Sequence, residues 1–213
     1  EGNRIGKVNV CYGTQYYSDI QKVEYEGEWF EGKRWGRGIH YDRHGNIVFD
    51  GEWVNDEQAE TTVTITDGNG IFYNHWEVLI VSDGCCTGNE WMAFDFSLLP
   101  CLRELQVGNH CFRCVEEVRM VGISALEKVV IGDVCFTLRE NAALVNASNC
   151  FFLKDCVRLR ELKIGSNSFN DYLVCEIENV SSLEVMQVGD LNEDSYNFYH
   201  ASLELKSDSQ RMR

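Results

Sequence analysis

A short hydrophobic phrase recurs along the second half of the chain and predicts a stack of repeating units. Each copy has two spaced apolar positions, a third apolar residue and a glycine, and in three copies a phenylalanine follows four residues later. The glycines are Gly108, Gly132, Gly165 and Gly189, at spacings of 24, 33 and 24 residues. A fixed spacing indicates stacked units, because one such unit cannot bury its apolar face alone.

Each unit is expected to hold two strands. The apolar residues that alternate before the glycine suit a strand, and the glycine turns the chain out of it. Most units continue into a second short apolar stretch, with the expected core pairs Val118 and Met120, Val174 and Ile177, and Leu203 and Leu205. Two strands in every unit favour coils that stack as parallel ladders.

A repeat of different character occupies residues 1–58. Aromatic residues and glycine alternate there, so they are predicted to share one face of a strand. The repeated positions are Tyr25, Gly27 and Trp29 and, 24 residues later, Phe49, Gly51 and Trp53. A glycine on the packed face lets a neighbouring aromatic ring lie against the backbone. Turn residues at 44–46 between these copies predict a run of short hairpins.

A threonine-rich segment joins the two repeats. Threonine alternates with valine and isoleucine at 60–66, which predicts a strand, and 67–70 has turn composition. We expect this strand to cover the first unit of the second array, whose apolar edge would otherwise be exposed. The predicted organisation is hairpin repeats (1–58), a connecting and capping segment (59–75), the second array (76–206) and a polar tail (207–213).

The first repeat resembles the MORN repeat family over about residues 17–56. The matching positions are Tyr25, Gly27, Trp29, Gly32, Lys33, Gly36 and Gly38. Asp56 stands where Gly32 stands in the preceding copy, so the array is expected to end at 53–56. The resemblance implies an elongated scaffold of the junction or cytoskeletal kind, and some members of the family have been proposed to bind phosphoinositides.

The second repeat resembles the leucine-rich repeat superfamily, and more closely its BspA-like branch, over about residues 76–206. The phrases that carry this resemblance lie at 107–112, 131–136 and 164–169, although the Ile-Pro phrase usual in that branch is absent. Together the two resemblances predict an all-β protein. Short antiparallel β-hairpin repeats would be followed by a leucine-rich-repeat-like parallel β-solenoid.

The charge balance argues against two kinds of partner. The chain has 19 Lys and Arg against 34 Asp and Glu, a net charge of −15, which opposes binding to nucleic acid. Lys33, Arg34 and Arg37 are a candidate site for acidic phospholipid. Such a site needs a cluster of about four to eight uncompensated cations, whereas acidic residues surround these three, so solvated strand edges of mixed charge are favoured. The sequence has no apolar run long enough to suggest a membrane span.

The ten cysteines leave the redox compartment open between two interpretations. Cys85, Cys111 and Cys135 fall at the same repeat position, which Ser168 occupies in another copy, so buried thiols of a cytoplasmic or cytoskeleton-associated protein are favoured. The alternative is a disulfide framework at the cell surface. The lone Cys-x-x-Cys at 111–114 lacks two further ligands, and neither a metal nor a cofactor is expected.

No catalytic constellation is evident, and the chain is predicted not to be an enzyme. Its histidines lie in separate units without a recurring nucleophile and are expected at the surface or in turns; they are His40, His44, His75, His110 and His200. The favoured function is a scaffold that presents a repeat surface to a protein partner. The alternatives are an extracellular adhesin or receptor ectodomain, and peripheral binding to acidic phospholipid.

The predicted contact surface lies where the repeat is interrupted. The 33-residue unit contains an extra stretch near 141–152, and a polar stretch at 191–197 precedes Phe198. Insertions in a stacked array form loops, often on the binding side. The candidate partner-binding residues are Asn141, Asn146, Asn149, Asn192, Glu193, Asp194 and Tyr196.

Overall fold

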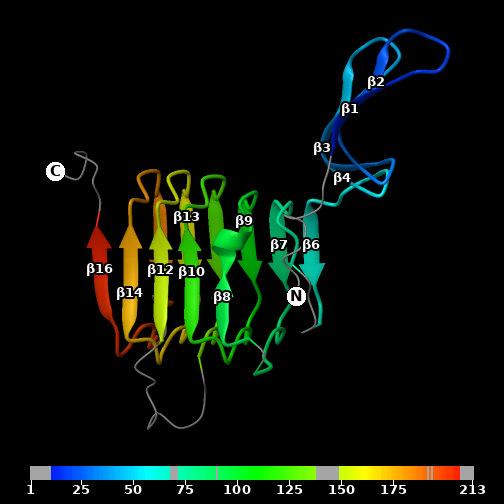
Figure 1. Ribbon diagram of the computed structural model, residues 1–213. Coiled ribbons are helices and arrows are strands. Elements are labelled where there is room, and N and C mark those ends of the chain that lie inside the picture. The colour runs from blue at the N-terminus through cyan, green and yellow to red at the C-terminus, as the bar shows by residue number, and fades with distance from the viewer. Residues whose placement is uncertain are drawn as a thin grey trace. The chain divides into compact units, whose positions relative to one another are not determined.

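The structure of the protein, a computed structural model, describes residues 11–67, 72–89, 91–137, 149–190, 192 and 194–206. Over these residues it is almost entirely β, with 16 strands and a 3-10 helix at Phe96–Leu98 (Figure 1). The all-β prediction is confirmed. The chain divides into two compact units, Glu1–Thr61 and Thr62–Arg213.

The first unit is an antiparallel sheet whose strands pair in chain order, as predicted for a run of hairpins. The strands are β1 (Cys11–Tyr16), β2 (Val23–Phe30), β3 (Lys33–Tyr41), β4 (Ile47–Val54) and β5 (Glu57–Gln58). Two hairpins turn through residue pairs with positive φ, Glu31 and Gly32 (49° and 78°) and Asn55 and Asp56 (57° and 74°). Positive φ at both positions matches the right-handed twist of the strands. Asp56 therefore forms the same turn as Gly32, and the sheet continues into β5.

A row of glycines crosses the first sheet and provides space for aromatic rings. Gly13, Gly27, Gly38 and Gly51 are register partners on β1 to β4. A Cβ atom on Gly38 would lie 2.1 Å from Tyr25 Oη, and one on Gly51 would lie 2.5 Å from Phe49 Cζ. Tyr25 is fully buried against this row. The prediction that glycine lets the rings lie against the backbone is confirmed.

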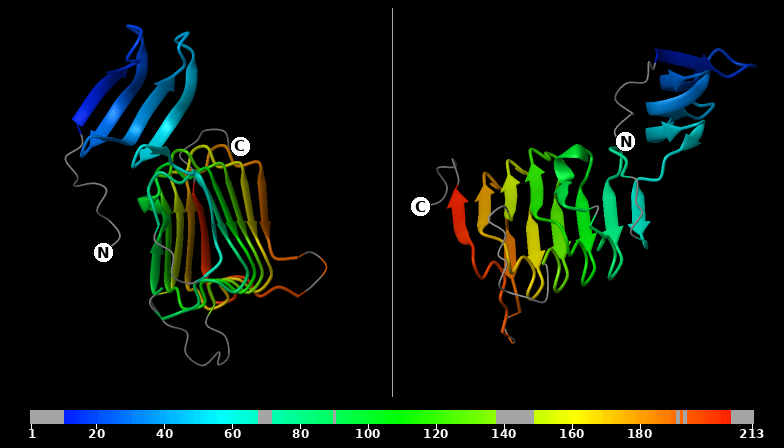
Figure 2. Two further views of the ribbon diagram at one scale, coloured as in Figure 1. Left: turned by 90° about the vertical axis from the view of Figure 1, so that its right-hand side faces the viewer. Right: turned by 60° about the horizontal axis from the view of Figure 1, so that its bottom comes forward.

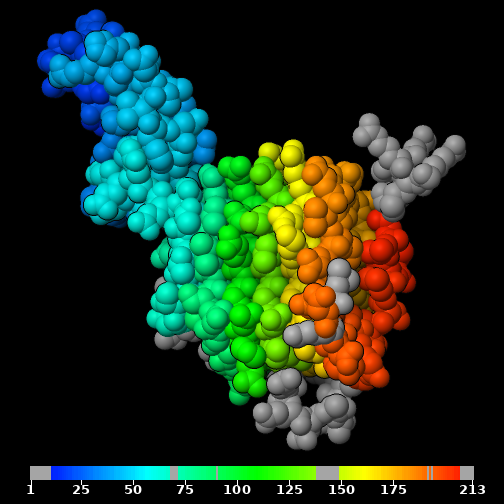
Figure 3. Space-filling model, turned by 180° about the vertical axis from the view of Figure 1, so that it is seen from behind, coloured from blue at the N-terminus to red at the C-terminus, as the bar shows by residue number. Residues whose placement is uncertain are grey.

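The second unit consists of two parallel sheets that face each other (Figure 2). One contains β6 (Thr62–Ile65), β7 (Val78–Val81), β9 (Glu104–Val107), β11 (Lys128–Ile131), β13 (Glu161–Ile164) and β15 (Val185–Val188). The other contains β8 (Ala93–Asp95), β10 (Glu117–Val121), β12 (Cys150–Lys154), β14 (Val174–Glu178) and β16 (Ser202–Lys206). From β7 onward the chain alternates between the sheets, so successive segments follow one another in order along the unit (Figure 3). The strand at Thr62–Ile65 pairs with β7 at the edge of its sheet.

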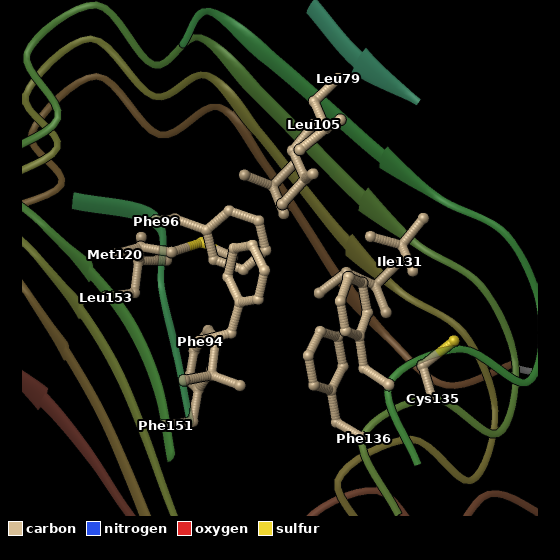
Figure 4. Close-up of a cluster of buried hydrophobic side chains, with 14 of the residues drawn as sticks. Leu79, Phe94, Phe96, Leu105, Met120, Ile131, Cys135, Phe136, Phe151 and Leu153 are labelled. Atoms are coloured by element: carbon tan, nitrogen blue, oxygen red, sulfur yellow. The ribbon is translucent and has the colours of Figure 1, made fainter. Parts of the chain in front are cut away.

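The core lies between these two sheets. On β9, Leu105 and Val107 are buried while Glu104 and Gln106 face outward, because successive side chains of a strand point to opposite faces. Figure 4 shows the inward side chains of the two sheets facing one another, including Leu79, Leu105 and Ile131 on one side and Phe94, Met120, Phe151 and Leu153 on the other.

A stack of phenylalanine rings closes one side of the core. Phe112, Phe136, Phe169 and Phe198 succeed one another with centroid distances of 4.9, 4.7 and 4.9 Å and interplanar angles of 9°, 4° and 6°. All four have positive φ, between 49° and 56°. This conformation costs free energy in a residue with a side chain, and it turns every ring into the core at the same repeat position.

Gly108, Gly132 and Gly165 precede this stack at a point where the backbones of consecutive repeats nearly touch. A Cβ atom on Gly132 would lie 2.8 Å from the carbonyl of Gly108, and one on Gly165 would lie 2.5 Å from the carbonyl carbon of Gly132. The glycines are therefore required by the close approach of backbone to backbone. Positive φ is not the reason at Gly108, Gly132 and Gly165, because the left-handed glycines described in the second unit are Gly84, Gly122 and Gly189.

Polar side chains also connect consecutive coils, and we call this set the donor column. Its members occupy the position just before each stacked phenylalanine, and each donates a hydrogen bond to a carbonyl oxygen of the preceding coil. The bonds run from Cys111 Sγ to Ser82 O (3.1 Å), Cys135 Sγ to Gly108 O (3.0 Å), Ser168 Oγ to Gly132 O (2.8 Å) and Asn197 Nδ2 to Gly165 O (2.6 Å). Cys85, Cys111 and Cys135 are buried, as predicted.

Two predictions about core positions are wrong. On β14 the inward residues are Cys175 and Ile177, because Val174 and Ile177 differ by an odd number and cannot share a face of a strand. Leu203 and Leu205 follow the core register but are more than half exposed, since β16 is the last strand of its sheet. His75 lies in a turn, which is one of the two placements predicted for the histidines, and burial there lowers its pKa.

Candidate functional site

Among the described residues, the connection between β15 and β16 carries a loop that the repeat does not explain. Gly189 has a φ of 76°, and the loop that follows projects from the unit in Figure 2. Three consecutive residues tie it to the preceding turn. Ser195 Oγ lies 2.9 Å from Ser166 Oγ, the Tyr196 amide donates to Asn167 Oδ1 (3.2 Å), and Asn197 Nδ2 donates to Gly165 O. The loop is thus held in position at its C-terminal end.

An exposed aromatic cluster lies at this anchored end. The side chains of Tyr196 and Tyr199 are 49% and 65% exposed, and their ring centroids are 5.7 Å apart in an edge-on arrangement. His200 follows with its ring centroid 4.9 Å from that of Tyr199, and it is exposed as well. Phe198, between the tyrosines, enters the phenylalanine stack. We call Tyr196, Tyr199 and His200 the aromatic cluster.

The structure places the predicted partner-binding residues in different environments. Asn192, Asp194 and Tyr196 are exposed in the loop before β16. Asn149 is only 1% exposed, and its Nδ2 donates to Asp171 Oδ2 (3.2 Å), so its assignment to a contact surface is wrong. It lies directly before β12 and is an interior residue. Asn141, Asn146 and Glu193 lie outside the described residues.

The sequence interpretation missed Tyr199 and His200. A signal for them was present in the run Tyr-Asn-Phe-Tyr-His at 196–200. Once Phe198 is assigned to the repeat phrase, the neighbouring aromatic residues are surplus to the core. Large rings that the core does not use and that face solvent are typical of contact surfaces.

The three basic residues proposed for lipid binding are each paired with an acceptor in the first unit. Arg34 Nε lies 3.4 Å from Asp56 Oδ1, and the guanidinium lies 4.2 Å from the ring centroid of Trp53. Arg37 pairs with Asp50 (2.8 Å), and Lys33 donates to Asn55. These contacts favour the mixed-charge interpretation over a cluster of uncompensated cations.

Charges on the outer faces of the two parallel sheets also alternate in sign. Lys128 lies 2.7 Å from Glu104 on the adjacent strand, and hydrogen bonds from Lys128 and Gln106 lower the pKa of Glu104. Lys154 pairs with Glu176 and Glu178 on the other sheet. Despite the net charge of the chain, these faces do not present a single-sign field.

Two of the buried thiols are poorly suited to nucleophilic chemistry. Burial raises the pKa of Cys156 to about 11 and that of Cys175 to about 12, so both stay protonated at neutral pH. The thiolate is the reactive form of cysteine. All ten cysteines lie within the described residues and none is in a disulfide. Over the same ranges, no three His, Cys, Asp or Glu side chains gather in a way that could hold a metal ion.

Comparison with known proteins provides no relative from which a function could be transferred. No protein-family model, no curated protein and no solved structure matches the chain. In the described part of the chain, no helix is long and apolar enough to cross a membrane. The candidate site therefore rests on the geometry of the loop before β16.

Proposed function

We propose that the chain is a non-enzymatic scaffold that binds a protein partner through the aromatic cluster. The supporting observation is that Tyr196, Tyr199 and His200 are exposed at the anchored end of a loop whose neighbouring residue enters the core. In the same proposal the second unit is a leucine-rich-repeat-like solenoid, and the first is a MORN-like hairpin array.

Physical chemistry favours a protein as the ligand of this cluster. Tyrosine offers a large apolar ring with a polar tip and loses little conformational entropy on binding, since it has two side-chain torsions. Tyrosine residues are enriched among the side chains that dominate interface energies. Because hydrogen bonds to Ser166, Asn167 and Gly165 already hold the loop, less ordering free energy would be lost on association.

The cysteines support a reducing compartment, so we propose a cytoplasmic or cytoskeleton-associated protein. Cys111 and Cys135 contribute to the donor column as thiols, and Cys156 Sγ donates to Met120 O (3.5 Å). Disulfides form mainly in oxidising compartments. A count of reactive thiols in the denatured, non-reduced protein tests this: ten are expected, and several missing thiols would favour the cell-surface alternative.

The binding proposal is tested by replacing the two exposed tyrosines. The wild type is used as bait in extracts of the source cells, the proteins that it retains are purified, and their binding to the wild type and to the double variant Tyr196→Ser, Tyr199→Ser is compared. We expect the double variant to bind such a partner at least about thirtyfold more weakly in calorimetry, as for residues that dominate an interface.

The control variant carries Tyr12→Ser and Tyr16→Ser, which alter two tyrosines of β1 that are 69% and 59% exposed. It should bind like the wild type. Equal partner binding by the wild type and the Tyr196, Tyr199 variant would contradict the proposal.

A further inference from the structure

The last strands of the two parallel sheets expose side chains that the preceding strands bury. Met186 and Val188 on β15 are register partners of Leu162 and Ile164, and Leu203 and Leu205 on β16 are partners of Cys175 and Ile177. The partners are at most 3% exposed, whereas the four terminal residues are between 40% and 56% exposed. The repeated apolar pattern therefore continues into a position where the described residues provide no cover.

The backbone of β16 is also oriented toward this open edge. The Ser202 amide and the Lys206 carbonyl bond toward the β14 side, to Leu173 O and Asn179 N (both 3.1 Å). Consecutive residues of a strand direct their backbone groups to opposite sides. The amide and carbonyl of Leu203 and Leu205 consequently point away from β14, where no other strand of the described residues lies (Figure 1). An unpaired edge of this kind is a template for adding a strand.

We propose that two copies of this chain associate through β16, which pairs antiparallel with β16 of the second copy around a two-fold axis at Leu205. An isologous contact of this kind places the same strand on both sides of the interface. Leu205 must then face Leu205 of the other copy as a hydrogen-bonded pair, which its outward backbone groups permit. The proposal is independent of the aromatic cluster.

The charges on β16 select this register. With Leu205 on the axis, Lys206 lies opposite Glu204 of the second copy, and the pair occurs twice. An axis at Glu204 would place two glutamates opposite each other, and an axis at Leu203 would pair neither charge with its opposite. Opposite charges across an antiparallel pair stabilise it, and like charges destabilise it. Lys206 and Glu204 already form an ion pair within one chain, so the edge has no net charge of its own.

The seven residues after Lys206 are a poor alternative occupant. Their sequence, Ser-Asp-Ser-Gln-Arg-Met-Arg, has a single apolar side chain, Met212. They lack the alternating apolar pattern that would be needed to cover Met186, Val188, Leu203 and Leu205. In the proposed register, a second β16 supplies Leu205 on the core face and Glu204 and Lys206 on the outer face.

The test uses charge variants whose pairing can be restored by mixing. Glu204→Lys and Lys206→Glu each place like charges opposite one another in a homodimer. A mixture of the two variants restores opposite charges at every pair. Sedimentation equilibrium should show a wild-type dimer, at least about tenfold weaker association of each variant alone, and recovery in the equimolar mixture.

A variant of the apolar contact residue, checked for correct folding, provides a second test. Leu205→Glu should give a monomer with an unchanged circular dichroism spectrum, while the matched control Val157→Glu, at a position 46% exposed elsewhere in the unit, should remain dimeric. A wild type that is monomeric at all concentrations would overturn the proposal. A dimer that is insensitive to both charge variants would overturn it as well, because its contact would lie on another surface.

Discussion

The two units share a 24-residue period but bury their repeats in different ways. In the first unit, Arg43 pairs with Asp19 and Tyr17 Oη donates to Tyr41 O, both across 24 residues. In the second, Lys128 pairs with Glu104 and the Asp133 amide donates to Asn109 Oδ1, also across 24 residues. Both periods contain two strands. In the first unit both strands join one sheet, whereas in the second each strand joins a different sheet.

This difference determines how much core each unit can form. Among the described residues, Tyr25 and Trp53 are the buried hydrophobic residues of the first unit, and 33 buried hydrophobic residues form the core of the second. One sheet must cover its own face, so its rings lie on the glycine row. Two sheets cover each other. The same period thus provides either a surface of rings packed on glycines or an enclosed core, depending on where the second strand pairs.

The largest expected effect separates the two faces of one strand in the second unit. Phe151 on β12 is fully buried, and Phe152 faces outward with Arg119 and Lys154 within 5.4 Å of its ring centroid. Phe151→Ala should destabilise the second unit by about 3–5 kcal/mol, because it leaves a cavity. Phe152→Ala should cost about 1 kcal/mol or less, mainly through lost cation–ring contacts. Urea unfolding measures both values.

Hydrogen exchange shows whether this effect is confined to one unit. Since the units have separate cores, exchange in β1 to β4 should be the same in Phe151→Ala as in the wild type, while exchange in β10 and β12 should be faster. Equal acceleration in both units would show that they unfold as one cooperative block. It would contradict the conclusion that each unit is stabilised by its own core.

The next effect distinguishes the two uses of glycine. A Cβ atom at Gly132 meets the backbone of the neighbouring coil, whereas one at Gly38 meets the ring of Tyr25. A backbone segment in a stack of strands has less freedom to move than a side-chain ring. We expect Gly132→Ala to destabilise the second unit by about 2–3 kcal/mol and Gly38→Ala to destabilise the first by about 1–2 kcal/mol, as for overpacked sites.

Thermal unfolding, monitored by hydrogen exchange in each unit, measures the loss of stability that each glycine variant causes. Tyr25→Phe, which removes only the hydroxyl that a Cβ at Gly38 would meet first, should reduce the effect of Gly38→Ala and leave that of Gly132→Ala unchanged. If Gly38→Ala destabilises its unit more than Gly132→Ala does, the Tyr25 ring yields less readily to an added Cβ atom than the backbone near Gly132 does, and the interpretation is wrong.

The alternation of apolar and polar residues predicted much of the fold, because strand pairing repeats it directly. Tyr25 and Trp29 on β2, and Leu105 and Val107 on β9, lie as their spacing required. Val174 was misassigned because its residue type does not show which face of the strand it occupies. Its odd spacing from Ile177 places the two side chains on opposite faces. Exposure of Leu203 depended on whether a further strand covers β16, which the residue types do not reveal.

The site was less accessible to prediction than the fold. A break in the repeat identified the loop at 191–197, yet polarity alone could not separate Asn149, which turns inward, from Asn192, which faces solvent. The sequence placed Cys111, Cys135 and Ser168 at one repeat position, but Asn197 and the hydrogen bonds of the donor column were not found, because cysteine, serine and asparagine share no hydropathy pattern. They share only the ability to donate a hydrogen bond to the same carbonyl position.

The smallest effect tests whether that shared ability is what the second unit requires. Cys135→Ser should cost about 1 kcal/mol or less, since a hydroxyl can donate to Gly108 O as Ser168 donates to Gly132 O. Cys175→Ser is the matched control, because Cys175 is also buried but lies on β14, outside the donor column. There the hydroxyl should cost about 1–3 kcal/mol. Equal costs in urea unfolding would mean that the column fills space and that its hydrogen bonds contribute little.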